Sequence, residues 1–297
     1  MEKNKTVPTL EIPNLHQLHF GHAEWSFFKK YHLFHVNRLE DAIGKLSFPL
    51  PPHRKTMNDI LFITKGKSRR SKGMNEYSFG KNELFILPAF QITAHESMSE
   101  DVEGFFFQFS PDVLADQMHL LKHFKFLNFN ANPIVRIPEQ DIPAVVNIFE
   151  RMMTLYERGG QEENKSLAMW YTMALFTEIN RHTQVEKVDK KNTAALITQQ
   201  FKDALTQYVY TYRTVQEFAQ LLHITPNHLN KCVKKTLNKT AQSLLNEMLV
   251  LEAKSLLKYS NLSISEIAEN LCKSTPSNFS RFFKKQTGIS PRDFASQ

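Results

Sequence analysis

Apolar residues recur every three or four positions through the last third of the chain, and this period predicts amphipathic helices. The stretch 262–294 predicts two short helices joined by a tight turn. A capping hydroxyl followed by proline begins the second helix, and glycine ends it. The positions that carry this pattern are Ile264, Ile267, Ala268 and Leu271 for the first helix, Phe279, Phe282 and Phe283 for the second, and Thr275, Pro276 and Gly288 for its ends. A buried helix that supports a polar, basic helix indicates a helix-turn-helix.

The same pattern occurs a second time, about fifty residues upstream. Its second helix is predicted at 226–237, where Thr225 and Pro226 repeat the helix start of the later copy at 276–287. A single helix is predicted between the copies, from Thr240 to Tyr259. Its length of roughly 30 Å is close to the rise of about 34 Å per turn of B-DNA. One chain could therefore place two helices in successive turns of a major groove.

The N-terminal half has the pattern of an antiparallel β-structure. Short apolar or alternating runs at Leu61–Thr64, Glu83–Leu87 and Glu103–Phe109 are separated by Gly and Pro residues, at the spacing of a small barrel or sandwich. In the last run, Phe105, Phe107 and Phe109 point to one side of the strand. These rings either belong to a strand buried on both faces or line a ligand cavity.

Two longer helices are predicted after this region, at Ile142–Arg158 and Glu162–Arg181, with Gly159 and Gly160 between them. They are expected to form an antiparallel hairpin. The predicted apolar stripe of the second helix comprises Leu167, Trp170, Met173, Ala174 and Thr177. Such stripes form either a domain core or a symmetric dimer contact. The polar residues 183–193 read as a linker.

Charge is unevenly divided along the chain. The chain has 37 Lys and Arg and 30 Asp and Glu residues, and from residue 190 onward there are 15 and 7. The first 189 residues therefore hold 22 basic and 23 acidic residues. A basic excess confined to the predicted helix-turn-helix region is typical of a nucleic-acid surface, although a solvated basic surface without a partner has the same composition.

Other features of the sequence argue against a secreted, a membrane-spanning or an enzymatic protein. The two cysteines, Cys232 and Cys272, cannot make a disulfide framework, which favours a reducing cytoplasm. No apolar run reaches the length of a membrane span, and residues 1–14 lack the apolar core of a signal peptide. No nucleophile with an activating base and no phosphate-binding glycine loop is evident, so we expect no enzyme activity and no cofactor.

The residues quoted above carry a family resemblance. Three blocks, TVQEFAQLLHITPNHLNKCVKK, LEAKSLLKYSNLSISEIAENL and TPSNFSRFFKKQTGISPRDF, resemble the DNA-binding domain of AraC/XylS-type bacterial transcription regulators over residues 195–297. The N-terminal half loosely resembles the cupin-like sensing and dimerisation half of such proteins. The resemblance implies an α+β chain with an N-terminal cupin-like antiparallel β-barrel, a helical hairpin and a C-terminal all-α double helix-turn-helix domain.

The resemblance also implies which segment of the chain has which role. Residues 1–135 would be the sensing domain, 136–182 a dimerising hairpin, 183–193 the linker and 194–297 the DNA-binding domain. The implied partners are double-stranded DNA, RNA polymerase, a small-molecule effector and a second copy of the chain. The implied activity is transcription regulation, as an activator.

The same resemblance implies roles for individual residues. The residues expected to face base edges are Asn227, Asn230, Lys231, Ser277, Ser280 and Arg281, and those expected to contact phosphates are Thr225, Lys234, Lys235, Thr275, Lys284 and Lys285. Asn can read adenine, and Lys or Arg can read guanine. The residues expected to line an effector pocket are His53, Phe62, Phe85, Phe105 and Phe107.

The chain departs from the family pattern in its second helix-turn-helix unit, and it lacks the metal ligands of cupin enzymes. The family usually has Gly-Phe after the first helix of the second unit, where this chain has Cys272 and Lys273. We expect Cys272 to cost about 1 kcal/mol if its φ is positive. In the barrel, His53-Arg54-Lys55 lacks the second histidine of a cupin metal site, and Glu83 and His95 do not complete one.

Two alternatives to a sequence-specific regulator stay open at this point. One is an interaction protein with a decayed second helix-turn-helix, acting through another regulator or polymerase. The other is a cupin-type metalloenzyme with an appended nucleic-acid module.

Overall fold

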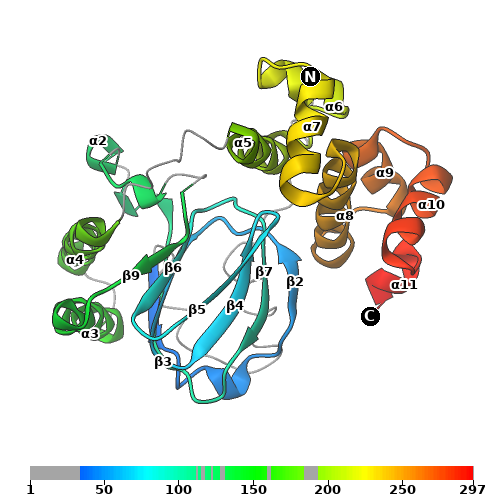
Figure 1. Cartoon of the computed structure of the whole chain (residues 1–297). Coiled ribbons are helices and arrows are strands. Elements are labelled where there is room, and N and C mark those ends of the chain that lie inside the picture. Colours follow the sequence, from blue (N-terminus) through cyan, green and yellow to red (C-terminus); the bar gives the residue numbers. More distant parts are fainter. Residues whose placement is uncertain are drawn as a thin grey trace. The chain divides into compact units, whose positions relative to one another are not determined.

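The computed structural model describes residues 34–111, 113–114, 118–121, 123–127, 131–158, 162–183 and 193–296 (Figure 1). The chain divides into two compact units, each described by itself: a β-rich unit that contains most residues before 186, and a helical unit after it. The predicted hairpin turn at Gly159 and Gly160 and linker residues 184–192 lie outside the described residues.

The β-rich unit contains two antiparallel sheets, in which the predicted strands are confirmed. The five-stranded sheet has the order β1-β8-β3-β6-β9 and the four-stranded sheet the order β2-β7-β4-β5. The strands are β1 (Phe34–Arg38), β2 (Leu50–His53), β3 (Asn58–Lys65), β4 (Lys67–Lys72), β5 (Asn75–Gly80), β6 (Glu83–Leu87), β7 (Thr93–Met98), β8 (Glu103–Phe109) and β9 (Ile134–Arg136). Short helical segments join them at η2 (Ile43–Lys45), α2 (Met118–Leu121), η4 (Lys125–Leu127) and η5 (Glu139–Asp141).

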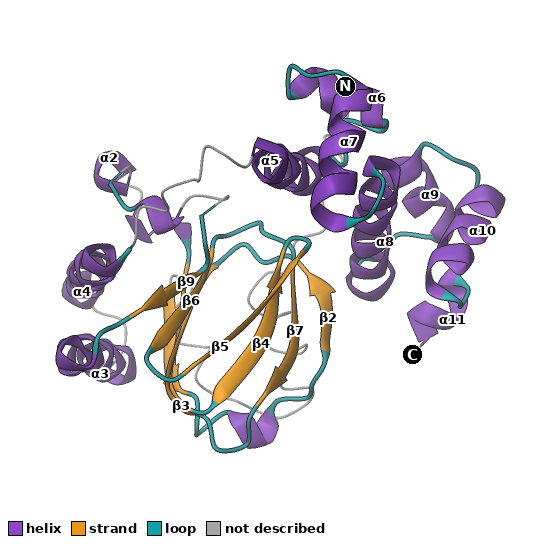
Figure 2. Cartoon of the chain, viewed as in Figure 1, coloured by secondary structure: helices purple, strands orange, loops and turns teal. Residues whose placement is uncertain are grey.

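The helical hairpin, α3 (Ile142–Arg158) and α4 (Glu162–His182), lies beside the five-stranded sheet (Figure 2). Phe149 of α3 is fully buried there. The Phe62 and Phe105 rings stack on it with centroid distances of 5.9 and 4.9 Å, and the Phe107 ring meets it edge-on at 6.5 Å. The hairpin therefore shares one core with the sheet.

This packing contradicts the expectation that Phe62, Phe105 and Phe107 line an effector pocket. Strand alternation turns all three rings toward the helices, where they are at most 2% exposed. The sequence pattern left both faces of β8 open, and only the placement of α3 decides between them. Phe85 lies on the other face of the sheet, stacked on Phe79 at 4.8 Å.

The predicted stripe of α4 is mostly exposed, which excludes the domain-core alternative for its exposed residues. Met173 is buried as expected, but Leu167 and Trp170 are 43% and 56% exposed. The buried face of α4 is instead formed by Ala168, Thr172, Met173, Leu175, Phe176 and Ile179. Apolar residues occupy two faces of this helix, so periodicity alone did not identify the one that packs on the sheet.

The helical unit contains seven helices among its described residues, which are α5 (Thr193–Tyr208), α6 (Val215–Leu221), α7 (Pro226–Leu237), α8 (Ala241–Tyr259), α9 (Ile264–Cys272), α10 (Pro276–Thr287) and α11 (Pro291–Ser296). The predicted bounds of α7 and α10 are confirmed. Thr225 and Thr275 cap them, each accepting a hydrogen bond from the third backbone N–H beyond it. Asn238 and Gly288 end them in left-handed conformations, with φ of 54° and 84°.

The turns inside the two helix pairs both contain a left-handed residue that is not glycine. These residues are His223, with φ of 55°, and Lys273, with φ of 44°. The expected strain at Cys272 was therefore misplaced by one residue, because α9 continues through Cys272 and Lys273 is its C-cap. Burial raises the pKa of the Cys272 thiol to about 11, so this cysteine stays protonated.

We predict that Lys273→Gly stabilises the helical unit. A side chain with β-carbon in the left-handed region is strained by about 1 kcal/mol or more, while glycine loses more backbone entropy on folding, so the net gain is roughly 0.5–1 kcal/mol. Urea unfolding followed by circular dichroism measures the change. Lys273→Ala retains the strain and serves as the control, and equal stability of the Gly and Ala variants would contradict the assignment.

Candidate nucleic-acid interface

The helix α8 supports both helix pairs of the helical unit. Its C-terminal half contributes Ala253 and Leu256 to a core shared with α9 and α10, where Phe279 and Phe283 are buried. Its N-terminal half buries Leu244, Leu245 and Met248, and it contacts α5, α6 and α7. With 19 residues, α8 is about 28 Å long. The two helices α7 and α10 thus both pack on α8.

Arg213, just before α6, ties the two pairs together by polar contacts. Its guanidinium donates to the backbone oxygens of Val209, of Tyr210 at 2.6 Å and of Asn270 in α9 at 2.9 Å. The Tyr210 hydroxyl donates to the buried carboxylate of Glu252 in α8 at 2.8 Å. These bonds cross from the end of α5 to both α8 and α9, so they fix one pair relative to the other.

The same segment begins α6 with a capping box. Thr214 accepts a hydrogen bond from the Glu217 N–H, and the Glu217 carboxylate accepts one from the Thr214 N–H. The Glu217 carboxylate also accepts from the Arg213 N–H at 2.9 Å. The bond from Arg213 and the one from the Thr214 hydroxyl lower the pKa of Glu217. Ser263 and Glu266 repeat this box at α9.

The exposed face of α7 is polar and basic. Asn227, Lys231, Lys234 and Lys235 are exposed as predicted, and the opposite face buries Leu229, Cys232 and Val233. The sequence interpretation missed His228, which is also exposed and precedes Lys231 by three residues. Residues three apart share a face of a helix, so this spacing could have identified it.

The helix α10 repeats this arrangement with different side chains. Ser277, Arg281, Lys284 and Lys285 are exposed, and Phe279 and Phe283 are buried. The missed residue here is Asn278, which occupies the position of His228. Its side-chain oxygen accepts a hydrogen bond of 2.6 Å from the Arg281 guanidinium. Asn278 thus restrains the side chain that the sequence predicts to read a base.

The other two residues predicted to contact bases, Asn230 and Ser280, are only partly exposed. Asn230 is half-buried, and its side-chain oxygen accepts a hydrogen bond of 3.0 Å from the Ala241 N–H at the start of α8. This geometry contradicts a free base-reading role for Asn230. Ser280, its counterpart in α10, is also half-buried. Pro291 stands where Ala241 does and has no N–H to offer, so Ser280 cannot repeat that bond.

Thr225 and Thr275, predicted to contact phosphates, act as N-caps. Each hydroxyl accepts from the backbone, at 3.2 Å from the His228 nitrogen and 3.3 Å from the Asn278 nitrogen. A hydroxyl that accepts still has its own proton to donate. Capping is therefore compatible with donation to a phosphate, and it places both threonines at helix N-termini, where anions are favoured.

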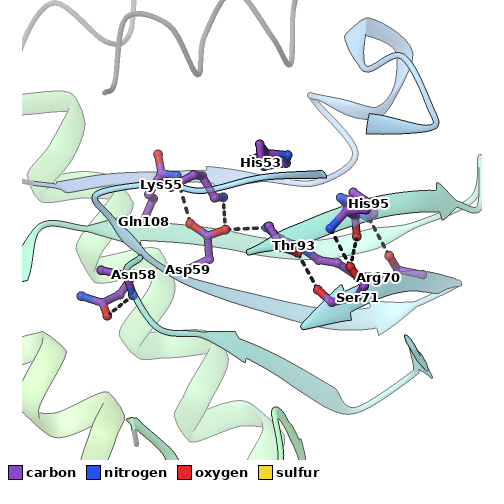
Figure 3. Close-up of polar contacts among 12 residues, drawn as sticks. His53, Lys55, Asn58, Asp59, Arg70, Ser71, Thr93, His95 and Gln108 are labelled. Atoms are coloured by element: carbon purple, nitrogen blue, oxygen red, sulfur yellow. Dashed lines mark hydrogen bonds and ion pairs between the residues drawn. The ribbon is translucent and has the colours of Figure 1, made fainter. Parts of the chain in front are cut away.

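In the β-rich unit, polar side chains from both sheets meet at one buried group (Figure 3). The Asp59 carboxylate accepts from Lys55, from Arg70 at 2.8 Å and from the Gln108 amide at 3.0 Å. Arg70 also donates to Thr93 at 3.1 Å. We name these five residues the inner ion cluster.

The inner ion cluster is almost fully excluded from solvent, since each member is at most 2% exposed. Burial by itself raises the pKa of a carboxyl group, but the charges of Lys55 and Arg70 lower the pKa of Asp59 to about 2. Asp59 is therefore ionised at neutral pH and is the counter-ion of both cations.

The histidines considered for a metal or effector site have other partners. The His53 Nδ1 lies 2.8 Å from the Pro51 oxygen, and the His95 Nε2 lies 2.8 Å from the Ser68 hydroxyl. The Glu83 carboxylate accepts from the Gly80 N–H at 2.8 Å. Within the described ranges, no group of three or more His, Cys, Asp or Glu residues is arranged to hold a metal ion.

Comparison with known proteins agrees with the geometry of the helical unit. Residues 218–297 match the family model described as "Helix-turn-helix domain". These residues are a helix-turn-helix domain of the AraC type. The AraC-type domain contains α7, α8, α9, α10 and α11.

Relatives and solved structures match this chain over different shares of its length. The HTH-type transcriptional regulator YisR of Bacillus subtilis is 27% identical over 120 residues, covering 40% of this chain and 42% of YisR. The C-terminal domain of AraT, a response regulator from Geobacillus stearothermophilus, is 27% identical with a TM-score of 0.31, covering 34% of this chain and 84% of that one. ToxT from Vibrio cholerae is 12% identical with a TM-score of 0.38, covering 89% and 98%. The chain thus spans less than half the length of YisR.

We predict that Asn230→Ala destabilises the AraC-type domain, because it leaves the Ala241 N–H at the start of α8 without its acceptor. The expected loss is about 0.5–2 kcal/mol of unfolding free energy. Chemical denaturation measures it, and Asn227→Ala, at an exposed position of the same helix, is the control with little change. Equal and small effects of both substitutions would contradict the structural role of Asn230.

Proposed function

We propose that the chain is a sequence-specific DNA-binding transcription regulator. The observation that carries this proposal is the pair of capped helices, α7 and α10, that expose equivalent polar and basic faces on one connecting helix. A basic helix of this kind enters the major groove, with its N-terminal residues at base edges. The cytoplasm, where a bacterial chromosome lies, is the matching location.

The exposed residues divide into two roles by position and chemistry. In α7, Asn227, His228 and Lys231 lie near the N-terminal end, and in α10 Ser277 and Arg281 do. Side chains of these types can donate to or accept from base edges. The exposed lysines farther along each helix, Lys234, Lys235, Lys284 and Lys285, are suited to phosphates, which set affinity and register but do not select sequence.

The second helix pair does not have the features of a decayed unit. Its capping box at Ser263, its cap at Thr275 and its terminal Gly288 are all formed, and Phe279 and Phe283 fill its core. These features favour a regulator with two functional recognition helices over an interaction protein that has lost one. We propose no enzyme activity; the family model that residues 218–297 match is described as a helix-turn-helix domain.

The β-rich unit supplies regulation in this proposal. An effector bound there changes the arrangement or availability of the DNA-binding unit, and the regulator acts on RNA polymerase as an activator. A second copy of the chain associates through α4, whose outer stripe combines the exposed Leu167 and Trp170 with Ala174 and Thr177. Exposed large apolar side chains at helical spacing suit a symmetric contact.

The base-reading role predicts a specific contrast between two basic residues of α10. Arg281→Ala should lower affinity for the preferred DNA by about 1–3 kcal/mol and relax the preference at one base pair. Lys284→Ala should weaken binding to all sequences about equally and reduce the salt dependence. Fluorescence-anisotropy titrations of the preferred and single-base-changed duplexes measure both effects. A uniform loss for Arg281→Ala would remove it from the base-reading set.

The dimer contact is tested by Trp170→Glu. A carboxylate in an apolar contact is strongly disfavoured, so the variant should sediment as a monomer at concentrations where the parent chain is dimeric. Trp170→Phe retains an apolar ring and is the matched control. Sedimentation velocity gives the answer, and a parent chain that stays monomeric at all concentrations would refute the contact.

A further inference from the structure

The short segment that joins α5 to α6 contacts both helix pairs of the helical unit. It leads directly into the first pair, α6 and α7, and two of its residues reach toward the second pair, α9 and α10. The Tyr210 ring packs on the core that α8 shares with α9 and α10, and its hydroxyl donates to Glu252 of α8. Arg213 reaches α9 itself. The two pairs are therefore linked through this segment as well as through α8.

Arg213 completes the C-terminal end of α9. The last carbonyl oxygens of a helix have no partner within the helix. The turn after α9 provides a donor for two oxygens, because the Lys273 N–H donates to those of Ala268 and Glu269. The next oxygen, that of Asn270, accepts from Nη2 of Arg213 at 2.9 Å. A guanidinium suits this position because the C-terminal end of a helix dipole favours positive charge.

The same guanidinium is attached to the first pair. Its Nη1 donates to the oxygen of Val209, and its Nη2 also donates to that of Tyr210 at 2.6 Å. Val209 is fully buried, and the preceding helix α5 packs on α7. All the acceptors of Arg213 named here are main-chain oxygens, which move only when their backbone moves. The guanidinium therefore fixes the position of α9 relative to α5 and α7.

A change in the distance between two DNA half-sites would act on this contact. One added base pair moves a half-site by about 3.4 Å along the duplex and turns it by about 35°. To follow the half-site, α10 and its partner α9 must shift relative to α7. The Arg213–Asn270 bond begins at 2.9 Å, and hydrogen bonds are lost beyond about 3.5 Å. A small part of the required shift is therefore enough to break it.

We propose that Arg213 is a positioning residue that determines which spacing between two DNA half-sites the chain accepts. In this role it contacts no base and no phosphate. Its hydrogen bonds hold α9 and α10 at one displacement from α7, so DNA of the matching spacing binds with these bonds intact. DNA with one base pair more or fewer binds only when they break. The inference rests on the proposed function, which supplies the two half-sites.

The test uses the full chain and the duplex that it selects from a randomised pool. Two further duplexes have one base pair added or removed between the half-sites, and fluorescence anisotropy gives the affinity for each. The parent chain should bind the altered spacings about tenfold or more weakly, the effect expected for one charge-assisted hydrogen bond. Arg213→Met should bind all three duplexes within about threefold of one another, because the bonds that penalise a shift are absent.

The ratio of affinities between spacings does not depend on the fraction of active protein, so partial destabilisation alone does not change it. Arg213→Lys retains the charge, but one ammonium nitrogen replaces the two guanidinium nitrogens that reach different acceptors. It should therefore also lose most of the discrimination. Arg292→Met removes an exposed arginine of the same unit and should retain the parent's ratio. Duplexes with one half-site scrambled should bind Arg213→Met as they bind the parent, because each pair still folds.

The proposal is overturned if Arg213→Met keeps the parent's ratio, or if the parent binds all three spacings equally. It is also overturned if Arg213→Met weakens every duplex by one factor and Arg213→Lys restores the loss, since that pattern belongs to a phosphate contact. Failure of both variants to bind even single half-sites would assign Arg213 to folding and remove its positioning role. A parent chain that binds DNA without sequence preference would refute the proposed function itself, whereas specific binding without spacing preference would refute only the role of Arg213.

Discussion

The arrangement of the helical unit depends on the fixed attachment of both helix pairs to α8. Leucines and Met248 on one half of this helix and Ala253 and Leu256 on the other belong to the cores of the two pairs. Arg213 links the two pairs by hydrogen bonds, because its guanidinium donates to a backbone oxygen just after α5 and to another near the end of α9. A flexible connection would let α7 and α10 bind DNA independently. A rigid connection fixes their separation and makes spacing part of the recognised sequence.

In the β-rich unit, both faces of the five-stranded sheet are buried, each against different partners. One face is sealed by the α3–α4 hairpin through Phe149 and its ring contacts. The other bears Asp59, which accepts from Lys55, located between β2 and β3, and from Arg70 of the four-stranded sheet. Burial of the apolar face stabilises the unit. The buried charges on the other face need a separate explanation, because burying ions costs free energy.

Local signals in the sequence predicted the helical unit well. The bounds of α7 and α10 followed from Thr-Pro starts and from Asn238 and Gly288 at the ends, because capping chemistry depends on only a few adjacent residues. The strands β6 and β8 were bounded correctly because their apolar or alternating runs are separated by Gly and Pro residues. The left-handed residue was misplaced from Lys273 to Cys272, since Cys272 stands where the family usually has Gly, whereas α9 continues through Cys272 in this chain.

Long-range packing was not predictable in this way. Phe105 and Phe107 could face either side of β8 until α3 was placed, and α4 has apolar residues on both its buried and its exposed face. Asn230 looked like a base reader because nothing in the sequence showed that its side chain meets the Ala241 N–H. The inner ion cluster joins residues as far apart as Lys55 and Gln108, and sequence spacing does not bring them together.

The central claim is that one chain reads DNA with two recognition helices held at a fixed separation. Selection of bound duplexes from a randomised pool by the full chain, followed by sequencing, tests this most directly. Two informative segments per chain are expected, separated centre to centre by about one helical turn, roughly 10 base pairs, with no variation in spacing. A single informative segment, or two segments at variable spacing, would contradict it.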